Sequence, residues 1–317
     1  MSHLNSLSLA GEGDERTVIV QRRSHAVAWR KMVTVLSFLL PALFFYGVFI
    51  LYPIVKAVQL SFFDWNGNTE HMNFVGLQNY TTVIKDQIFI NALLHNIVWV
   101  LLECVLVIFP VLILAIMISS LKKGRMFFRS AFYLPAVLSL PVVAVIWGKI
   151  YDPFIGPINA LLKMVGLPQM ALNWLGDPVT VLPSLVVASI WVAYGFYMVL
   201  YLAGLQSIDY TLYEAADIDG ASKTDKFFHV TLPSLRNIMN LVISMIIINS
   251  LKSFSMVWII TQGGPFYKSE VVATYVYKAA FSMFKVSYGA AGSVILALIV
   301  IVVTVLFNYV RERRESS

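Results

Sequence analysis

Long apolar stretches separated by short polar segments dominate the pattern along this chain. A helix needs about 20 apolar residues to cross the hydrocarbon core of a membrane, and six stretches reach that length. They predict transmembrane helices over about residues 32–62, 91–121, 130–150, 178–208, 237–261 and 286–310. The second stretch carries His95 and Glu103, and the fifth carries Lys252. Residues 1–31 are predicted as a cytoplasmic N-terminal arm, 32–310 as the six-span domain and 311–317 as a short tail.

Composition supports the membrane assignment. The chain is 59% hydrophobic and only 13% charged, with a mean hydropathy of +0.77, which lies far outside the range of soluble domains. The predicted fold class is therefore an all-α integral membrane protein. Cys104 is the one cysteine of the sequence and falls inside the second span, so the sequence predicts no disulfide framework and no metal site.

The distribution of basic residues predicts the orientation. If the N-terminal arm is cytoplasmic, fifteen Lys and Arg residues fall on the cytoplasmic side and seven on the other, with Lys252 inside a span. Because basic residues are retained on the cytoplasmic side, both termini and the polar segment 209–233 are predicted there. The net charge of +6 then needs no nucleic acid as partner, since anionic membrane lipids account for it.

The segment 209–233, between the fourth and fifth spans, has the pattern of a short helical hairpin. The carboxylate of Asp209 is placed to cap a helix, and Leu212, Ala215 and Ala216 follow on one face. Gly220 stands where a left-handed helix end is expected, and Pro233 is expected to end a second short helix. An ordinary interfacial helix would explain the first of these helices alone.

The order of motifs resembles a known family. Glu214-Ala215-Ala216, Asp219-Gly220-Ala221 and Leu232-Pro233 resemble the EAA loop of bacterial ABC importer permeases, the element that fits into a cleft of the ATPase subunit. Further motifs resemble the first permease subunit of carbohydrate importers such as the maltose and glycerol-3-phosphate transporters. These motifs are Tyr52-Pro53-Ile54, Phe74 to Tyr80, Gly156 to Asn159, Asn173-Trp174-Leu175 and Thr261 to Pro265.

This resemblance implies the type I importer permease fold in the bacterial inner membrane. It implies as partners a second, homologous permease subunit, two ATPase subunits and an extracytoplasmic (periplasmic) solute-binding protein. It also implies ATPase-coupling roles for residues of the loop: Glu214, Ala215, Ala216, Asp219, Gly220 and Pro233.

The sequence itself offers no means of hydrolysing ATP. It has no G-x-x-x-x-G-K-[ST] phosphate loop, because Gly220-Ala221-Ser222-Lys223-Thr224 lacks the required glycines,. No constellation of catalytic residues is present either. We therefore expect no enzymatic activity, no catalytic residue and no cofactor in this chain, with ATP and Mg²⁺ bound by the separate ATPase subunits.

The resemblance also points to sugar-facing residues on the helices before and after the loop. The predicted substrate-pathway residues are Ser189, Val192, Ala193, Phe196, Asn249, Ser250, Lys252 and Ser253. An aromatic face suits the C–H surface of a sugar, and small polar groups suit its hydroxyls. The competing interpretation is helix packing, because Ser and Ala are favoured between membrane helices.

Lys252 allows three interpretations, because a lysine inside a membrane is costly and needs a partner or water. It can pair with Glu103, it can extend to the membrane surface, or it can face the pathway. In the pathway it would favour an anionic substrate such as a uronate oligosaccharide or a sugar phosphate. An alternative function is a proton-coupled secondary transporter that uses His95, Glu103 and Lys252 as a relay.

Overall fold

The computed structural model describes residues 32–68 and 72–315. The predicted arm 1–31 and the last two residues of the predicted tail lie outside the described residues. The described part is helical apart from one antiparallel ribbon, in which Phe63 pairs with Phe74 and Asp64 with Asn73. The chain divides into two compact units with their boundary between Ala57 and Val58, and each unit is described by itself.

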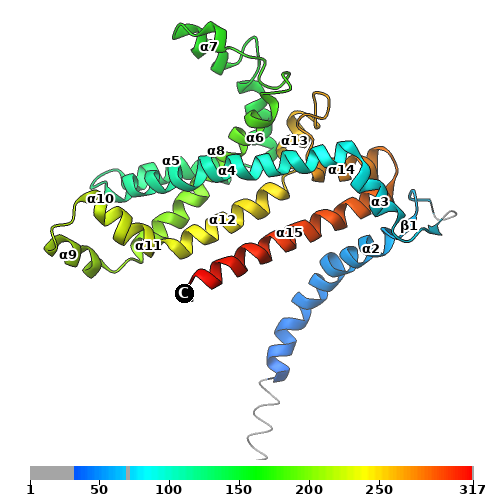
Figure 1. Cartoon of the computed structure of the whole chain (residues 1–317), viewed down its shortest axis with the longest axis horizontal. Helices are drawn as coiled ribbons and strands as arrows, with labels where there is room; N and C mark the ends of the chain where they lie inside the picture. Colours follow the sequence, from blue (N-terminus) through cyan, green and yellow to red (C-terminus); the bar gives the residue numbers. More distant parts are fainter. Residues whose placement is uncertain (1–31, 69–71, 316–317) are drawn as a thin grey trace, which may run out of the picture. The chain divides into compact units, whose positions relative to one another are not determined.

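The larger unit begins at Val58 and is called the main unit. Its elements can be followed along the chain in Figure 1. Before the second predicted span they are β1 (Phe63–Asp64), β2 (Asn73–Phe74) and α3 (Gln78–Lys85). The next elements, up to the fourth predicted span, are α4 (Gln87–Ser120), α5 (Arg125–Val137), α6 (Leu140–Ile150), α7 (Pro157–Met164), the 3₁₀ helix η2 (Pro168–Met170) and α8 (Val181–Gln206). Then come α9 (Tyr210–Ile218), α10 (Lys223–Lys226), the π turn η3 (Phe227–Thr231), α11 (Leu232–Ser234) and α12 (Arg236–Leu251). The last elements are α13 (Ser255–Ile260), α14 (Val272–Tyr277), the π turn η4 (Lys278–Ser282) and α15 (Val286–Glu315).

The N-terminal apolar helix runs from Met32 to Leu60. It contains a π turn, η1 (Gly47–Leu51), which continues directly into α2 (Tyr52–Leu60). The N–H of Tyr52 bonds to the carbonyl oxygen of Gly47 in that wide turn. Pro53 follows at once and has no N–H to donate, so the wider turn lets the helix continue through a residue that would otherwise interrupt it.

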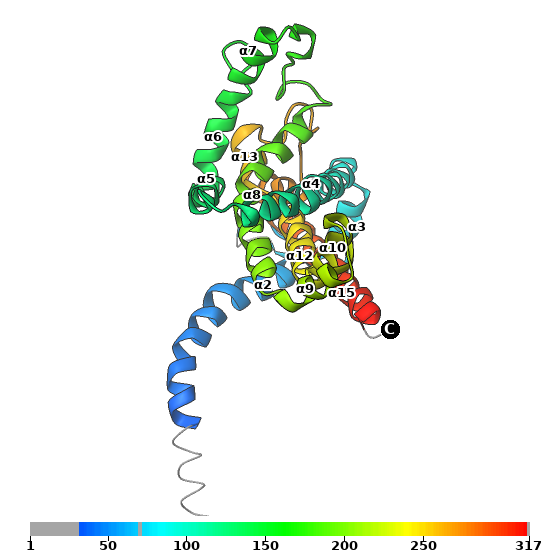
Figure 2. The same cartoon turned by 90° about the vertical axis from the view of Figure 1, so that its left-hand side faces the viewer.

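Five helices of the described part are long and apolar enough to cross a membrane, or six if the bent pair α5–α6 is counted as one span. The third predicted span, over 130–150, is not a single straight helix, because α5 and α6 meet at an angle of 99°. Pro141 lies in the first turn of α6, where a missing N–H is harmless. The α-helical ladder of α5 therefore ends just before it. Both α6 and α7 project away from the helix bundle (Figure 2).

The fifth predicted span is also interrupted, since α12 ends at Leu251 and α13 begins at Ser255. Asn96 of α4 accounts for the interruption. Its side-chain nitrogen donates to the carbonyl oxygens of Ser250 and Leu251 at 3.0 and 3.2 Å. Its side-chain oxygen accepts the N–H of Val272 at 2.9 Å. One buried amide therefore satisfies backbone groups that the end of a helix leaves free.

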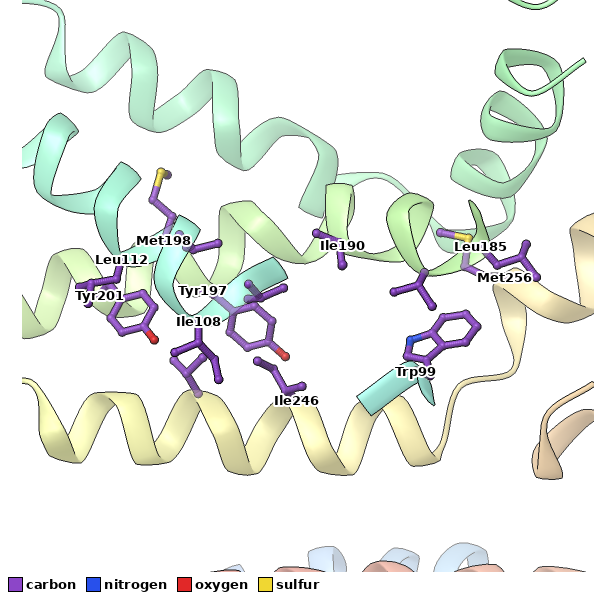
Figure 3. Packing of buried hydrophobic residues seen from close by; sticks show 14 of the residues in the cluster. Trp99, Ile108, Leu112, Leu185, Ile190, Tyr197, Met198, Tyr201, Ile246 and Met256 are labelled. Atoms are coloured by element: carbon purple, nitrogen blue, oxygen red, sulfur yellow. The ribbon is translucent and has the colours of Figure 1, made fainter. Parts of the chain in front are cut away.

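Helix α4 is the centre of the main unit, because it packs against both α8 and α12. The interior between the three helices is filled by large side chains, seen in Figure 3. Trp99, Leu112, Tyr201 and Ile246 are all fully buried there. In water such burial would itself stabilise the fold. Inside a bilayer the gain comes from close packing instead, since lipid tails are as apolar as the side chains.

Helix α5 lies unusually close to α8 at Gly195. A Cβ atom at Gly195 would come within 2.4 Å of the carbonyl oxygen of Phe132 and within 2.6 Å of the Cα of Tyr133. Only glycine fits at that distance, and small residues at membrane-helix interfaces commonly serve this purpose. Gly148 of α6 is a useful contrast, because nothing lies within 4 Å of a Cβ built there.

We expect Gly195→Ala to destabilise the protein, because the added methyl group must push the α5 backbone away. Overpacking of this kind costs about 1–3 kcal/mol. Gly148→Ala adds the same group in open space and is expected to leave stability nearly unchanged. The measurement is the midpoint of thermal unfolding of both variants in one detergent. Equal midpoints would contradict the close α5–α8 contact.

Candidate coupling loop and pathway residues

The segment 209–233 is held in shape by its own hydrogen bonds, beginning with a cap. Asp209 Oδ1 accepts the N–H of Thr211 at 3.0 Å, and α9 starts at the next residue, Tyr210. This confirms the predicted N-cap. The bond from the backbone of Thr211, together with one from its side chain, holds the pKa of the Asp209 carboxyl below its usual value. The carboxylate is therefore the form that caps the helix.

The C-terminal end of α9 also has the predicted geometry. Gly220 has a φ of +73°, a conformation that glycine adopts without steric cost. The N–H of Ala221 bonds to the carbonyl of Ala216 at 2.9 Å, and the N–H of Gly220 bonds to that of Asp217 at 3.1 Å. These two bonds form a Schellman motif, which turns the chain sharply after Asp219.

The second half of the loop begins with another cap. Ser222 Oγ accepts the N–H of Asp225 at 3.2 Å, and Asp225 Oδ2 accepts the N–H of Ser222 at 2.9 Å. This reciprocal pair is a capping box. The hydrogen bonds from the side chain and backbone of Ser222 lower the pKa of the Asp225 carboxyl, so the box is made by a carboxylate.

Pro233 does not end the second short helix, and that prediction was wrong. Pro233 lies in the first turn of α11, directly after the π turn η3. In that turn the N–H of Leu232 bonds to the carbonyl oxygen of Phe227. The wider π turn and the missing N–H of proline compensate one another, so the chain stays helical from Lys223 to Ser234.

Two side-chain contacts join α9 to the rest of the loop. Asp217 of α9 forms an ion pair with Lys226 of α10. The Tyr213 hydroxyl of α9 lies 2.8 Å from Thr231 Oγ1 at the end of η3. The ion pair is largely exposed and contributes little by itself. With the two caps and the Schellman motif, however, it makes the loop an ordered unit.

Helix α9 leaves its other side chains open to contact. None of its residues is buried within the described part of the chain. Leu212 is 48% exposed and Ile218 87% exposed. Glu214 and Ala215 are exposed as well, and Ala216 is half-buried. Large exposed apolar side chains beside small ones are typical of a surface that another protein covers.

Two of the predicted pathway residues, Ser189 and Ser250, instead bond to a carboxyl group of the main unit. Ser189 of α8 donates to Glu103 Oε1 at 3.2 Å, and the Ser250 hydroxyl of α12 donates to Glu103 Oε2. Ser250 and Glu103 are buried. Because Glu103 belongs to α4, its carboxyl group joins three helices. A buried carboxyl needs such donors, since leaving it unpaired in a low dielectric is costly.

Of the three interpretations of Lys252, the ion pair with Glu103 is not observed. The described residues contain two ion pairs, Asp217–Lys226 and Glu270–Lys278. Ser250 and Lys252 are two residues apart, so their side chains point about 200° apart around a helix. Ser250 faces α4, and Lys252 therefore faces the opposite way. There it lines a groove of about 400 Å³ with Val276, Ser293 and other residues of α14 and α15.

The remaining predicted pathway residues divide by exposure. Val192 and Ala193 are half-buried and pack against the interior cluster. Ser253 is half-buried in the interruption between α12 and α13. Phe196, at 39%, and Asn249 are exposed. The structure thus leaves Phe196, Asn249 and Lys252 exposed within the chain, whereas Ser250 is buried and Ser189 is half-buried against Glu103.

The three residues of the alternative proton relay are not brought together. His95 Nδ1 lies 2.7 Å from the backbone oxygen of Glu270. Glu103 is eight residues further along α4, which corresponds to about 12 Å at 1.5 Å per residue. Lys252 faces α14 and α15. The geometry offers no short path for a proton between them.

The sequence reasoning missed a polar cluster at the far end of the main unit. Glu270 is fully buried and ion-paired with Lys278 of η4, and Asp86 meets the hydroxyls of Tyr275 and Tyr288. The motif Thr261 to Pro265 gave a partial signal, because Gly263 lies directly against the Glu270 carboxylate. Asp86, however, is 189 residues from Tyr275 and 202 from Tyr288, and no local pattern links them.

Comparison with known proteins places this fold and this loop together in one family. Residues 87–316 match the family described as "binding-protein-dependent transport system inner membrane component". The probable ABC transporter permease protein YurN of Bacillus subtilis (strain 168) is 35% identical over 278 residues, which are 87% of this chain and 94% of that protein. The lactose transport system permease protein LacF of Rhizobium radiobacter is 31% identical, over 88% of this chain and 94% of that protein.

A solved structure shares the fold. It belongs to a bacterial ABC transporter involved in the import of the acidic polysaccharide alginate, and the similar chain has a TM-score of 0.80 at 24% identity. The match covers 92% of this chain and 99% of that chain. The family assignment excludes a secondary transporter, and a permease subunit is not itself an enzyme. This multi-pass inner-membrane protein is therefore a member of the binding-protein-dependent family of ABC transporter permeases.

Proposed function

We propose that this chain forms one half of the translocation pathway of an importer for a sugar or oligosaccharide, and that α9 receives the movement of an ATPase subunit. The observation that carries the proposal is that α9 is ordered at both ends but exposed along its length. It is ordered at both ends by the Asp209 cap and the Gly220 turn, yet buries none of its side chains within the described part of the chain. A short helix held rigidly and left uncovered is suited to docking.

The connections of the loop explain how docking can act at a distance. Helix α8 enters the loop and α12 leaves it, and both carry a serine bonded to Glu103 of α4. A displacement of α9 would therefore move α8 and α12 together with α4. Interfaces between packed helices respond to small shifts by changing between discrete arrangements, as alternating access requires.

The proposed orientation places the loop and both termini in the cytoplasm, where ATP is present. It rests on the excess of Lys and Arg in the segments on that side,. The proposed partners are a second permease subunit with its own coupling loop, two ATPase subunits that bind ATP and Mg²⁺, and a solute-binding protein on the outer side. Glu214 is placed to meet basic side chains or backbone N–H groups of the ATPase.

The proposed substrate is a saccharide, as for the lactose permease among the relatives. The finer proposal of an anionic saccharide rests on Lys252. This lysine is exposed within its own chain, beside a groove lined otherwise by Ser293 and apolar residues. An unpaired lysine inside a membrane faces protein or water, and an acidic substrate would supply its missing counter-charge.

We expect Gly220→Val to abolish transport while leaving membrane insertion intact. A β-branched residue cannot adopt the positive φ of Gly220 without strain, so the turn after α9 must change. The matched control is Gly166→Val, because Gly166 also has a positive φ, +82°, with open space around it, but lies outside the loop. The measurement is sugar uptake and sugar-stimulated ATP hydrolysis by the reconstituted complex.

The contrast between the two glycine variants decides the coupling proposal. Loss of transport in Gly220→Val alone supports it. Equal transport by both variants, or equal loss in both, would show that the turn in the loop has no special role.

The second variant pair tests Lys252. Because the lysine makes no ion pair with Glu103, Lys252→Met should leave the thermal midpoint of the complex unchanged and should reduce transport of an acidic oligosaccharide by about tenfold relative to a neutral one. Glu103→Ala, by contrast, leaves two serine hydroxyls unpaired and opens a cavity, so we expect a lower midpoint.

Both transport assays use the same proteoliposomes, with a uronate trisaccharide and a neutral trisaccharide delivered by the binding protein. Unchanged acidic transport in Lys252→Met would remove Lys252 from the pathway. A fall in its thermal midpoint would instead restore a structural role for the lysine.

A further inference from the structure

A cleft of about 560 Å³ opens at the end of the main unit opposite the coupling loop. Its lining residues come from α3, the loop before α14, α14, η4 and the start of α15, and Figure 1 shows α3, α14 and the start of α15 at this end of the unit. We call it the lysine–tyrosine cleft. Its main side chains are Lys85, Lys278, Lys285, Tyr267, Tyr275 and Tyr288. The proposed orientation puts it on the outer face, where substrate arrives.

One wall of the cleft is a fixed hydrogen-bonded network. The hydroxyls of Tyr275 and Tyr288 donate to Asp86 Oδ2 at 2.6 and 3.0 Å, and the two hydroxyls lie 2.7 Å apart. Partial burial acts to raise the pKa of Asp86, but the bonds from Tyr275, Ile88 and Tyr288 outweigh it and lower the pKa. The carboxylate therefore stays ionised and keeps both tyrosine rings in place.

The floor of the cleft contains a buried carboxylate that is only half satisfied. Glu270 Oε2 is paired with Lys278, while Glu270 Oε1 has no hydrogen-bond partner in the described part of the chain. Gly263 packs so closely that a Cβ there would lie 1.9 Å from Oε2, which holds the carboxylate in position. A buried acceptor without a donor is costly, and a ligand hydroxyl would be a suitable donor.

The lysines of the cleft differ in what they already bind. Lys278 is paired with Glu270 and lies 5.2 Å from the centre of the Tyr267 ring. Lys85, the last residue of α3, and Lys285, just before α15, are exposed. Neither belongs to an ion pair of the described residues. The ammonium groups of Lys85 and Lys285 are therefore available to bind an anion.

We propose that the lysine–tyrosine cleft binds an acidic sugar unit, such as a uronate residue, before it enters the pathway. Lys85 and Lys285 would bind its carboxylate, and Glu270 Oε1 would accept one of its hydroxyls. The tyrosine rings offer apolar faces for the C–H surface of the sugar. Pockets of this kind combine apolar walls with a few well-placed polar groups. The inference rests on the proposed function of saccharide import and on its orientation.

The test uses the assembled complex in lipid nanodiscs, without the solute-binding protein, and measures binding of trigalacturonate and of neutral maltotriose. We expect the double variant Lys85→Gln/Lys285→Gln to weaken trigalacturonate binding about tenfold and to leave maltotriose binding unchanged. The control Lys268→Gln removes an exposed lysine at the same end of the unit that does not line the cleft. The trigalacturonate affinity of this variant should stay within about twofold of that of the unmodified protein.

Four results would overturn the proposal. One is unchanged trigalacturonate binding in the double variant, and another is an equal loss in Lys268→Gln, which would indicate unspecific charge attraction. Loss of binding in Lys252→Met but not in the double variant would place the uronate in the pathway. If the binding protein is then added, its weaker association with the double variant at unchanged sugar binding would make the cleft a protein-docking surface.

The proposed function has its own separate readout. Sugar-stimulated ATP hydrolysis by the complete transporter, with its binding protein, tests saccharide import whether or not the cleft binds uronate. Stimulation together with no binding in the cleft rejects the cleft alone, whereas no stimulation by any sugar rejects the import function itself.

Discussion

The arrangement of the main unit depends on one carboxyl group inside the membrane. Glu103 stands near the middle of the long helix α4 and accepts hydroxyl bonds from Ser189 on α8 and Ser250 on α12. Between lipid-embedded helices, packing and hydrogen bonds replace the hydrophobic effect as the source of association. A group that binds two other helices at once therefore determines how three helices are registered against one another. Asn96 acts similarly nearer the N-terminal end of α4. Its side chain bonds to the backbone of Ser250, Leu251 and Val272.

Local geometry explains why part of the proposed coupling loop, residues 209–233, could be predicted from sequence. The Asp209 cap and the left-handed Gly220 depend on a few consecutive residues, so their patterns can be read directly. Pro233 could not be judged that way, because the π turn before it decides whether a proline is tolerated.

The lengths of the spans were likewise predictable from hydropathy, but the 99° bend between α5 and α6 was not, since a run of apolar residues carries no information about direction.

The predicted pathway residues show that sequence patterns also fail to identify the contacts of individual side chains. Sequence reasoning placed Ser250 and Lys252 in one group, Ser250 because of its position on the helix after the loop and Lys252 because it is a charged residue inside a span. Helical periodicity alone separates them, since residues two apart face opposite sides. What periodicity cannot supply is the identity of each neighbour. The bond from Ser250 to Glu103 joins residues 147 positions apart, and the hydrogen bond between Tyr275 and Asp86 joins residues 189 apart.

The interruption of the fifth span restricts what can surround this part of the protein. At 16 residues, α12 is about 24 Å long, which is less than the roughly 30 Å of the hydrocarbon core. The non-helical backbone at Lys252–Phe254 therefore lies at membrane depth, where acyl chains cannot hydrogen-bond to it. Irregular backbone is tolerated at that depth only where protein or water covers it. The backbone at this interruption must consequently be shielded from lipid, either by the rest of this chain, by water or by a protein partner.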